Sequence, residues 1–325
     1  MLQLLKASAH QWCVNGIFDH ISAAFGTDGN IDIGGGTQNG VTLQNSLMTH
    51  PLANAGHYEG DHAFNQLLAR GANLSLLYNY YGNANQRSSD FGNYPKTQSI
   101  GNTLHNARYT ALVYTGYSDQ NTSAEVPSID MRRNTFKHGP MSHPTEKDIR
   151  LRNISTTAGL FCPIYLEGNV SPFVVDPTIL AQQKNMARML TPSNTTDSIT
   201  VDDWVVEVSV GTPEIEMRTA AAAFTYVMAN AGNNRTRDSL DTLVLNQAQG
   251  LAAEISVRPT TMTAAGGYPT VASGTYPTTN ADGIPTAWRT TNAESRAWYT
   301  LDAGGTGRMI IENYADDVAQ GRYTP

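Results

Sequence analysis

The chain contains few charged residues. Asp, Glu, Lys and Arg make up 15% of its 325 residues, whereas a typical soluble domain has roughly 25%. Thr, Asn, Gly and Ser take their place. A polar surface with few charges costs less to desolvate against another molecule, because buried charges must be paired whereas hydroxyls and amides need only hydrogen bonds. The composition therefore predicts a surface rich in intermolecular contacts.

Basic residues are scarce at the start of the chain. The formal net charge is −7, and Lys6 is the one basic side chain in residues 1–69. Proteins that grip nucleic acid over their whole surface need clustered Lys and Arg to neutralise phosphates. The sequence therefore excludes that class, and it excludes a basic N-terminal arm that condenses RNA.

Two cysteines, Cys13 and Cys162, are too few for a disulfide framework, and their apolar surroundings predict buried free thiols. The first residues lack the apolar stretch of about 7–15 residues that a signal peptide needs. No segment approaches the ~18 apolar residues of a membrane-spanning helix. We therefore expect an intracellular soluble protein.

Apolar residues spaced three and four apart predict helices over about 2–25, 62–70, 74–81 and 99–114. Two Pro residues preceded by an N-cap type, in Asp176-Pro177 and Thr212-Pro213, predict further helices over 177–190 and 213–230. The last of these is apolar nearly all round, so Ala222 is expected to be buried.

Alternating apolar residues over 204–210 predict one clear strand, and residues 255–257 and 309–311 predict shorter ones. The expected fold class is α+β and helix-rich, with several helices, a small β-sheet and long irregular loops. A jelly roll is excluded, because it needs about eight regularly spaced strands. We divide one integrated domain into a mainly helical part, a basic loop, a mixed helix/strand core, an extended arm rich in Thr, Tyr and Pro, and a C-terminal segment: 1–117, 118–147, 148–258, 259–293 and 294–325.

The arm lacks periodicity and is too long for an ordinary loop in a compact domain. Proline limits its conformational entropy, and its aromatic residues offer contact area. We expect Tyr268, Tyr276 and Trp288 to anchor it on a neighbouring subunit.

One cluster has the composition of a metal site. Imidazole and carboxylate groups, acceptable zinc or iron ligands, occur at His57, Glu59, Asp61 and His62. The flanking glycines instead favour a loop that enters a helix, with Asp61 as its N-cap. We therefore expect no metal, no other cofactor and no catalytic residue, and we keep a metal-dependent hydrolase built on this cluster as the alternative.

Two Gly-rich segments imitate ligand-binding loops. The segment that begins at Asp28 resembles the start of a calcium loop, but Ile33 stands where the turn glycine belongs and Asn39 where the bidentate Glu belongs. Residues 301–308 resemble the phosphate-binding turn of hexokinase-type sugar kinases, yet too little chain follows to complete a nucleotide site. Both segments are interpreted as tight turns.

One basic cluster stands out. Six of the chain's 21 Lys and Arg residues fall within residues 132–152, at Arg132, Arg133, Lys137, Lys147, Arg150 and Arg152. Such a patch binds a phosphate backbone without base specificity, or it pairs with the acidic surface of an adjacent subunit. The sequence leaves both interpretations open.

Low charge, abundant Thr and Asn, the arm and the absence of a catalytic motif together resemble the capsid proteins of totivirus-like double-stranded RNA viruses. The resemblance implies a structural subunit rather than an enzyme, which assembles with copies of itself around an RNA genome. It also implies location in a virion assembled in the host cytoplasm, without membrane contact.

Overall fold

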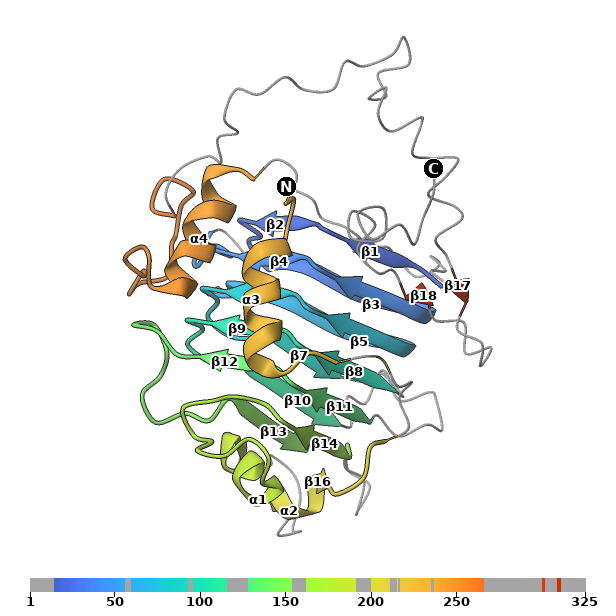
Figure 1. The fold of residues 1–325 in the computed structure, drawn as a ribbon. Helices are drawn as coiled ribbons and strands as arrows, with labels where there is room; N and C mark the ends of the chain where they lie inside the picture. The colour runs from blue at the N-terminus through green and yellow to red at the C-terminus, as the bar shows by residue number, and fades with distance from the viewer. Residues whose placement is uncertain are drawn as a thin grey trace.

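The computed structural model describes residues 15–55, 60–92, 96–115, 128–153, 162–190, 200–210, 215, 217–234, 237–265, 300–301 and 309–310. Successive coils of short strands stack on one another, from β1 and β2 at one end to β14 and β16 at the other (Figure 1). Every strand pair within the two large sheets is parallel. The architecture is mostly β and resembles a right-handed parallel β-helix, so the expected helix-rich α+β fold class is wrong.

The stack has three faces. The first and second faces form a single 11-stranded sheet, because the long strands β3 (Gly29–Gln44) and β5 (Phe64–Leu77) bend from one face into the other. Besides the first halves of β3 and β5, the first face contains β7 (Ser89–Gly92), β10 (Ala111–Thr115), β13 (Ile149–Asn153) and β15 (Ala187–Met189). Besides their second halves, the second face contains β1 (Ile17–Asp19), β8 (Thr97–Ile100), β11 (Ile129–Arg132), β14 (Ile164–Glu167) and β16 (Val205–Val206). The third face contains β2 (Ser22–Ala24), β4 (Leu47–Thr49), β6 (Tyr80–Gly82), β9 (Thr103–His105) and β12 (Thr135–Lys137).

An asparagine ladder joins the coils where the second face turns into the third. The backbone N–H of Asn79 donates to Oδ1 of Asn102 at 2.8 Å, and Asn102 and Asn134 repeat the bond to the next coil at 2.9 and 3.0 Å. The ladder continues through Asn169 to the side chain of Gln183. Each turn contains a left-handed residue just before the ladder position, such as Tyr78 or Gly101. The side chains therefore satisfy turn N–H groups that no strand can pair.

The side chains of each short strand point alternately into and out of the stack, and the inward ones fill the interior. Inward residues from all three faces form one hydrophobic cluster, among them Leu43, Leu76, Met131, Ile149 and Leu166. Each of these side chains is almost completely buried. Because a strand contributes only two or three inward residues, the core is built by stacking coils rather than by any single element.

Short helices occur near the far end and beside the stack. Helices α1 (Leu180–Gln183) and α2 (Val201–Trp204) contact β14, β15 and β16, and Trp204 is fully buried in the core. Helices α3 (Ala220–Asn230) and α4 (Ser239–Gln249) pack beside the third face and its junction with the second, on Leu47, Tyr80 and Ile100 (Figure 1). Among the described residues, no helix is long and apolar enough to cross a membrane.

Most expected helices are strands. The described part of 2–25 contains β1 and β2, residues 62–81 contain β5 and β6, and residues 99–114 lie mainly in β8, β9 and β10. The apolar spacing that predicted helices arises because each short strand alternates and each bend shifts the inward parity. The expected strand over 204–210 shrinks to β16, and residues 255–257 form no strand.

The helix expected over 213–230 is confirmed for α3, although it begins after Thr219 rather than after Thr212. The expected burial of Ala222 is wrong: Ala222 is exposed, whereas Ala223 on the next position is 1% exposed. The helix expected over 177–190 is reduced to the four-residue α1 and the 3-10 helix η1 (Lys184–Met186) that follows it, before β15 begins at Ala187. Asp176 accepts hydrogen bonds from Thr178 in a local turn rather than capping a longer helix.

Cys162 is confirmed as a buried free thiol, whereas Cys13 lies outside the described residues. The arm anchors Tyr268, Tyr276 and Trp288 also lie outside them, and so do residues 302–308. Residues 309–310 form β18 (Met309–Ile310), which pairs antiparallel with β17 (Thr300–Leu301). The boundaries of the five expected parts stay a prediction.

Candidate functional site: an arginine row on the first face

One register position runs across the outside of the first face. Its residues alternate with inward residues such as Leu68, Phe91 and Leu151, so their side chains point away from the core. From coil to coil this position is occupied by Asp32, Leu67, Asp90, Leu112, Arg150 and Arg188. Four of the six successive coils thus have a charged residue at this register position.

Asp90 is the most deeply buried charged group of this position. Its side chain is 0% exposed, and its Oδ2 lies 3.0 Å from Nε of Arg87. Burial raises the pKa of Asp90 to about 7; Arg87 and Arg150 oppose that rise, whereas Asp32 adds to it. Among the described residues, neither carboxylate oxygen of Asp90 accepts a hydrogen bond. Asp90 is therefore a buried carboxylate that changes charge near neutral pH.

Arg150 lies beside Asp90 and is itself mostly buried. Its Nη2 donates to Oε1 of Gln86 at 2.9 Å, and its guanidinium stacks over the ring of Tyr109, 4.4 Å from the centroid. Arg108 lies over the same ring at 5.1 Å. Burial lowers the pKa of Arg150, an effect that nearby Glu146 opposes. Tyr109 and Gln86 thus fix the plane of this guanidinium.

Arg188 continues the row on the next coil. Its Nε lies 2.9 Å from Oε2 of Glu146, and its side chain is 44% exposed. Arg150 and Arg188 lie in β13 and β15, whereas Arg87 and Arg108 lie in the turns just before β7 and β10; these four strands are adjacent in the sheet. Neighbouring strands are about 4.8 Å apart. We call these four residues the arginine row; it presents planar donors that suit carboxylates or phosphates in a repeating chain.

The structure divides the basic cluster that the sequence indicated. Of its six members, Arg150 and Arg152 lie on β13 of the first face, whereas Arg132 lies on β11 of the second face, near Asp130. Arg133 pairs with Glu167 in a turn, and Nζ of Lys137 donates to the carbonyl oxygen of Ala248. Lys147 lies over the ring of Phe173 at 4.0 Å. The structure therefore does not gather these residues into one patch.

The expected metal cluster is only half described, because His57 and Glu59 lie outside the described residues. Asp61 forms an ion pair with Arg258, and Nε2 of His62 lies 3.8 Å from Oδ1 of Asp28. Within the part of the chain that the structure describes, no three His, Cys, Asp or Glu residues gather as metal ligands. Asp61 is not an N-cap, because a strand follows it rather than a helix.

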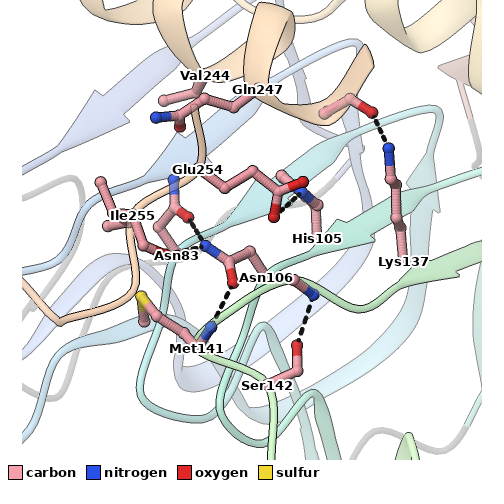
Figure 2. A network of polar contacts seen from close by, with 12 residues as sticks. Asn83, His105, Asn106, Lys137, Met141, Ser142, Val244, Gln247, Glu254 and Ile255 are labelled. Carbon is pink, nitrogen blue, oxygen red and sulfur yellow. Dashed lines mark hydrogen bonds and ion pairs between the residues drawn. The ribbon is translucent and has the colours of Figure 1, made fainter. Parts of the chain in front are cut away.

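A second polar network lies on the third face, under the segment that follows α4 (Figure 2). The hydroxyl group of Tyr80 lies 2.9 Å from Nδ1 of His105. Nε2 of His105 lies 3.3 Å from Oε2 of Glu254 (Figure 2). Nδ2 of Asn106 donates both to Asn83 and to the carbonyl oxygen of Ile255. Burial lowers the pKa of His105 to about 3 and raises that of Glu254. These contacts clamp residues 254–255 to the stack.

Sequence reasoning missed Arg87, Asp90, Tyr109 and Arg188. A signal for the fold was present, because polar residues recur in pairs four apart, as in Asn79 and Asn83 or Asn102 and Asn106. In each of these pairs the first residue is a ladder position and the second has a left-handed backbone. That repeat marks one turn of each coil. Once coils are aligned on it, the residues of the first face fall into register.

No protein-family model matches the chain. It is 25% identical over 312 residues to a probable pectate lyase C of Aspergillus flavus, which covers 95% of this chain and 67% of that protein. Probable pectate lyases C of Aspergillus terreus and Aspergillus oryzae are 24% and 25% identical over 312 residues. The chain thus spans about two thirds of the length of these distant relatives.

These findings overturn the resemblance to totivirus-like capsid proteins. A stack of parallel coils replaces the mainly helical shell subunit, and the similarity to fungal lyases covers nearly the whole chain. The assignment as a structural capsid subunit that encloses an RNA genome is therefore wrong. Self-association stays a prediction, which sizing of the purified chain can check.

Proposed function

We propose that the protein is a polysaccharide lyase that acts on pectate, a linear chain of uronate sugars, at the arginine row. The observation that carries the proposal is the placement of arginines on four adjacent coils, two of them in strands of the first face and two in the turns that lead into it. The distant similarity to probable pectate lyases supports the same chemistry.

The chemistry suits a row of fixed cations. A lyase transfers the proton next to the uronate carboxylate to a general base; the electron pair of that C–H bond forms a C=C bond, the glycosidic C–O bond breaks, and the leaving oxygen takes a proton and departs as a hydroxyl group. Negative charge builds up on the carboxylate during proton removal. A guanidinium that is already oriented stabilises this charge without reorganising. Arg150, held by Tyr109 and Gln86, is the best-oriented candidate.

Polygalacturonate tests the proposal. The product carries a double bond conjugated to its carboxylate, so ultraviolet absorbance should rise with polygalacturonate and not with a neutral polysaccharide. The assay is run with and without an added divalent cation, because carboxylates of such polymers bind these ions. We expect Arg150→Ala to lower kcat/KM by about 100-fold or more, because one transition-state charge contact contributes about 3 kcal/mol.

Arg133→Ala is the matched control, since Arg133 also pairs with a carboxylate but lies in a turn between the second and third faces. It should leave kcat/KM within about twofold of the unmodified protein. Binding of polygalacturonate without any absorbance change would contradict the lyase and leave an acidic-polysaccharide binding protein.

A further inference from the structure

Asp90 is a fully buried carboxylate with a close ion-pair partner and a second cation nearby among the described residues. Arg87 faces it from the same coil at 3.0 Å, and Arg150 faces it from β13, two strands away. Asp32 is the charged group on the other side, two strands away in β3. The residues directly in register, Leu67 and Leu112, are apolar. A buried carboxylate therefore shares its position with the cations that would hold a substrate.

The protonation state of Asp90 sets the net charge of the group that it forms with Arg87 and Arg150. The net charge of these three side chains is about +1 when Asp90 is ionised and about +2 when Asp90 is protonated. Arg188 is balanced by Glu146. An incoming carboxylate competes with Asp90 for the same guanidinium groups, and its own negative charge disfavours the ionised form of Asp90.

We propose that Asp90 gates the arginine row: protonation of Asp90 strengthens binding of a linear polyuronate, and binding of the polyuronate in turn takes up one proton at Asp90. The effect of the proton on polyuronate binding and the effect of the polyuronate on proton binding have the same coupling free energy, because linkage between two binding events is reciprocal. The inference rests on the proposed function, since it takes a polyuronate as the ligand. Asp90 acts through the arginines and is a positioning residue.

The expected change of affinity with pH follows from this coupling. Each unit by which a bound polyuronate raises the pKa of Asp90 changes the affinity tenfold across the pH range in which the group titrates. The pKa of Asp90 in the free protein is about 7, so a bound polyuronate that raises it by about two units makes the affinity fall by about tenfold between pH 6 and pH 8. The effect weakens with added salt, which screens the exposed side of the row.

Calorimetry with a galacturonate oligomer, at pH 6, 7 and 8 and at low ionic strength, measures the affinity. Repeating each titration in two buffers of different ionisation enthalpy counts the protons taken up. We expect the unmodified protein to take up as much as about half a proton at pH 7, where Asp90 of the free protein is already about half protonated, and more at pH 8. Asp90→Asn should bind with an affinity that is nearly constant over this range and should take up none. Asp202→Asn, which removes an exposed carboxylate paired with Lys184, is the matched control and should behave like the unmodified protein.

Two results would overturn the gate: affinity of the unmodified protein that does not change from pH 6 to pH 8, or an unchanged pH dependence in a folded Asp90→Asn variant. Proton uptake by the unmodified protein decides the matter if that variant does not fold. Pectate cleavage is not needed for this experiment. Tight, pH-independent binding with cleavage therefore sinks the gate alone, whereas pH-dependent binding without cleavage sinks the lyase alone.

Discussion

Oδ1 of Asn134 accepts the backbone N–H of Asn102, one coil earlier, at 2.9 Å. The same asparagine donates from Nδ2 to the carbonyl oxygen of Ser99 at 2.8 Å. One fully buried side chain thus pairs an N–H and a carbonyl of the neighbouring coil, and the ladder holds successive turns at a constant height.

Asn134→Ala should therefore destabilise the protein strongly. The substitution leaves a buried N–H and a buried carbonyl unpaired, and each unpaired group costs about 1–3 kcal/mol, so we expect on the order of 2–5 kcal/mol in the free energy of unfolding. Urea denaturation measures the loss. Asn233→Ala, which changes an exposed asparagine outside the ladder, should change stability by less than about 0.5 kcal/mol. Equal effects of the two substitutions would contradict this role of the ladder.

Two adjacent alanines of α3 give a second test. Ala223 packs against Leu47, Tyr78 and their neighbours and is 1% exposed, whereas Ala222 is exposed. Ala223→Asp should unfold the protein or make it insoluble, because an unpaired buried charge costs several kcal/mol. Ala222→Asp should melt within a few degrees of the unmodified protein, as followed by circular dichroism. Insolubility of the Ala222→Asp variant would show that α3 buries its other face.

Gly139 leaves room for the contacts that hold residues 254–255 against the third face. A Cβ at this position would overlap the carboxylate of Glu254 and the amide of Asn106. Gly139→Ala should therefore cost about 1–3 kcal/mol by overpacking and by displacing Glu254 from His105. In a Glu254→Ala background the same substitution should cost less. Additive effects in this double-mutant cycle would mean that the two residues do not compete for space.

Asp241 should make stability depend on pH. It lies in the first turn of α4, accepts a hydrogen bond from Ser22, and burial raises its pKa to about 6. The folded protein therefore binds a proton at this group more tightly than the unfolded chain, whose carboxyl titrates near pH 4. Its contribution to stability is complete below about pH 4 and is lost as pH rises through 6. Asp241→Asn should flatten the pH dependence of the melting temperature between pH 4 and pH 7, and an unchanged slope would contradict the assignment.

Local sequence was sufficient for a few features of this protein. The run of helix-forming residues around Phe224 indicated α3 from local sequence, because helical hydrogen bonds join residues four apart. The apolar surroundings of Cys162 likewise indicated its burial. The sparse charge, which suggested a surface rich in contacts, is consistent with a ladder and turns built from Asn, Ser and Thr.

The β-helix and its site depended on tertiary structure. Residues 75, 98, 130 and 165 are neighbours on the second face although they lie far apart in the chain at unequal spacings, so no fixed period in the sequence reveals the pairing. Strands of three to five residues are too short for alternation to outweigh chance helical spacing. Arg150 stood in a basic stretch of sequence, but its neighbours Asp90, Tyr109 and Gln86 come from earlier coils. Stacking of parallel coils, whose hydrogen bonds and inward side chains reward only the correct register, decided which charges meet.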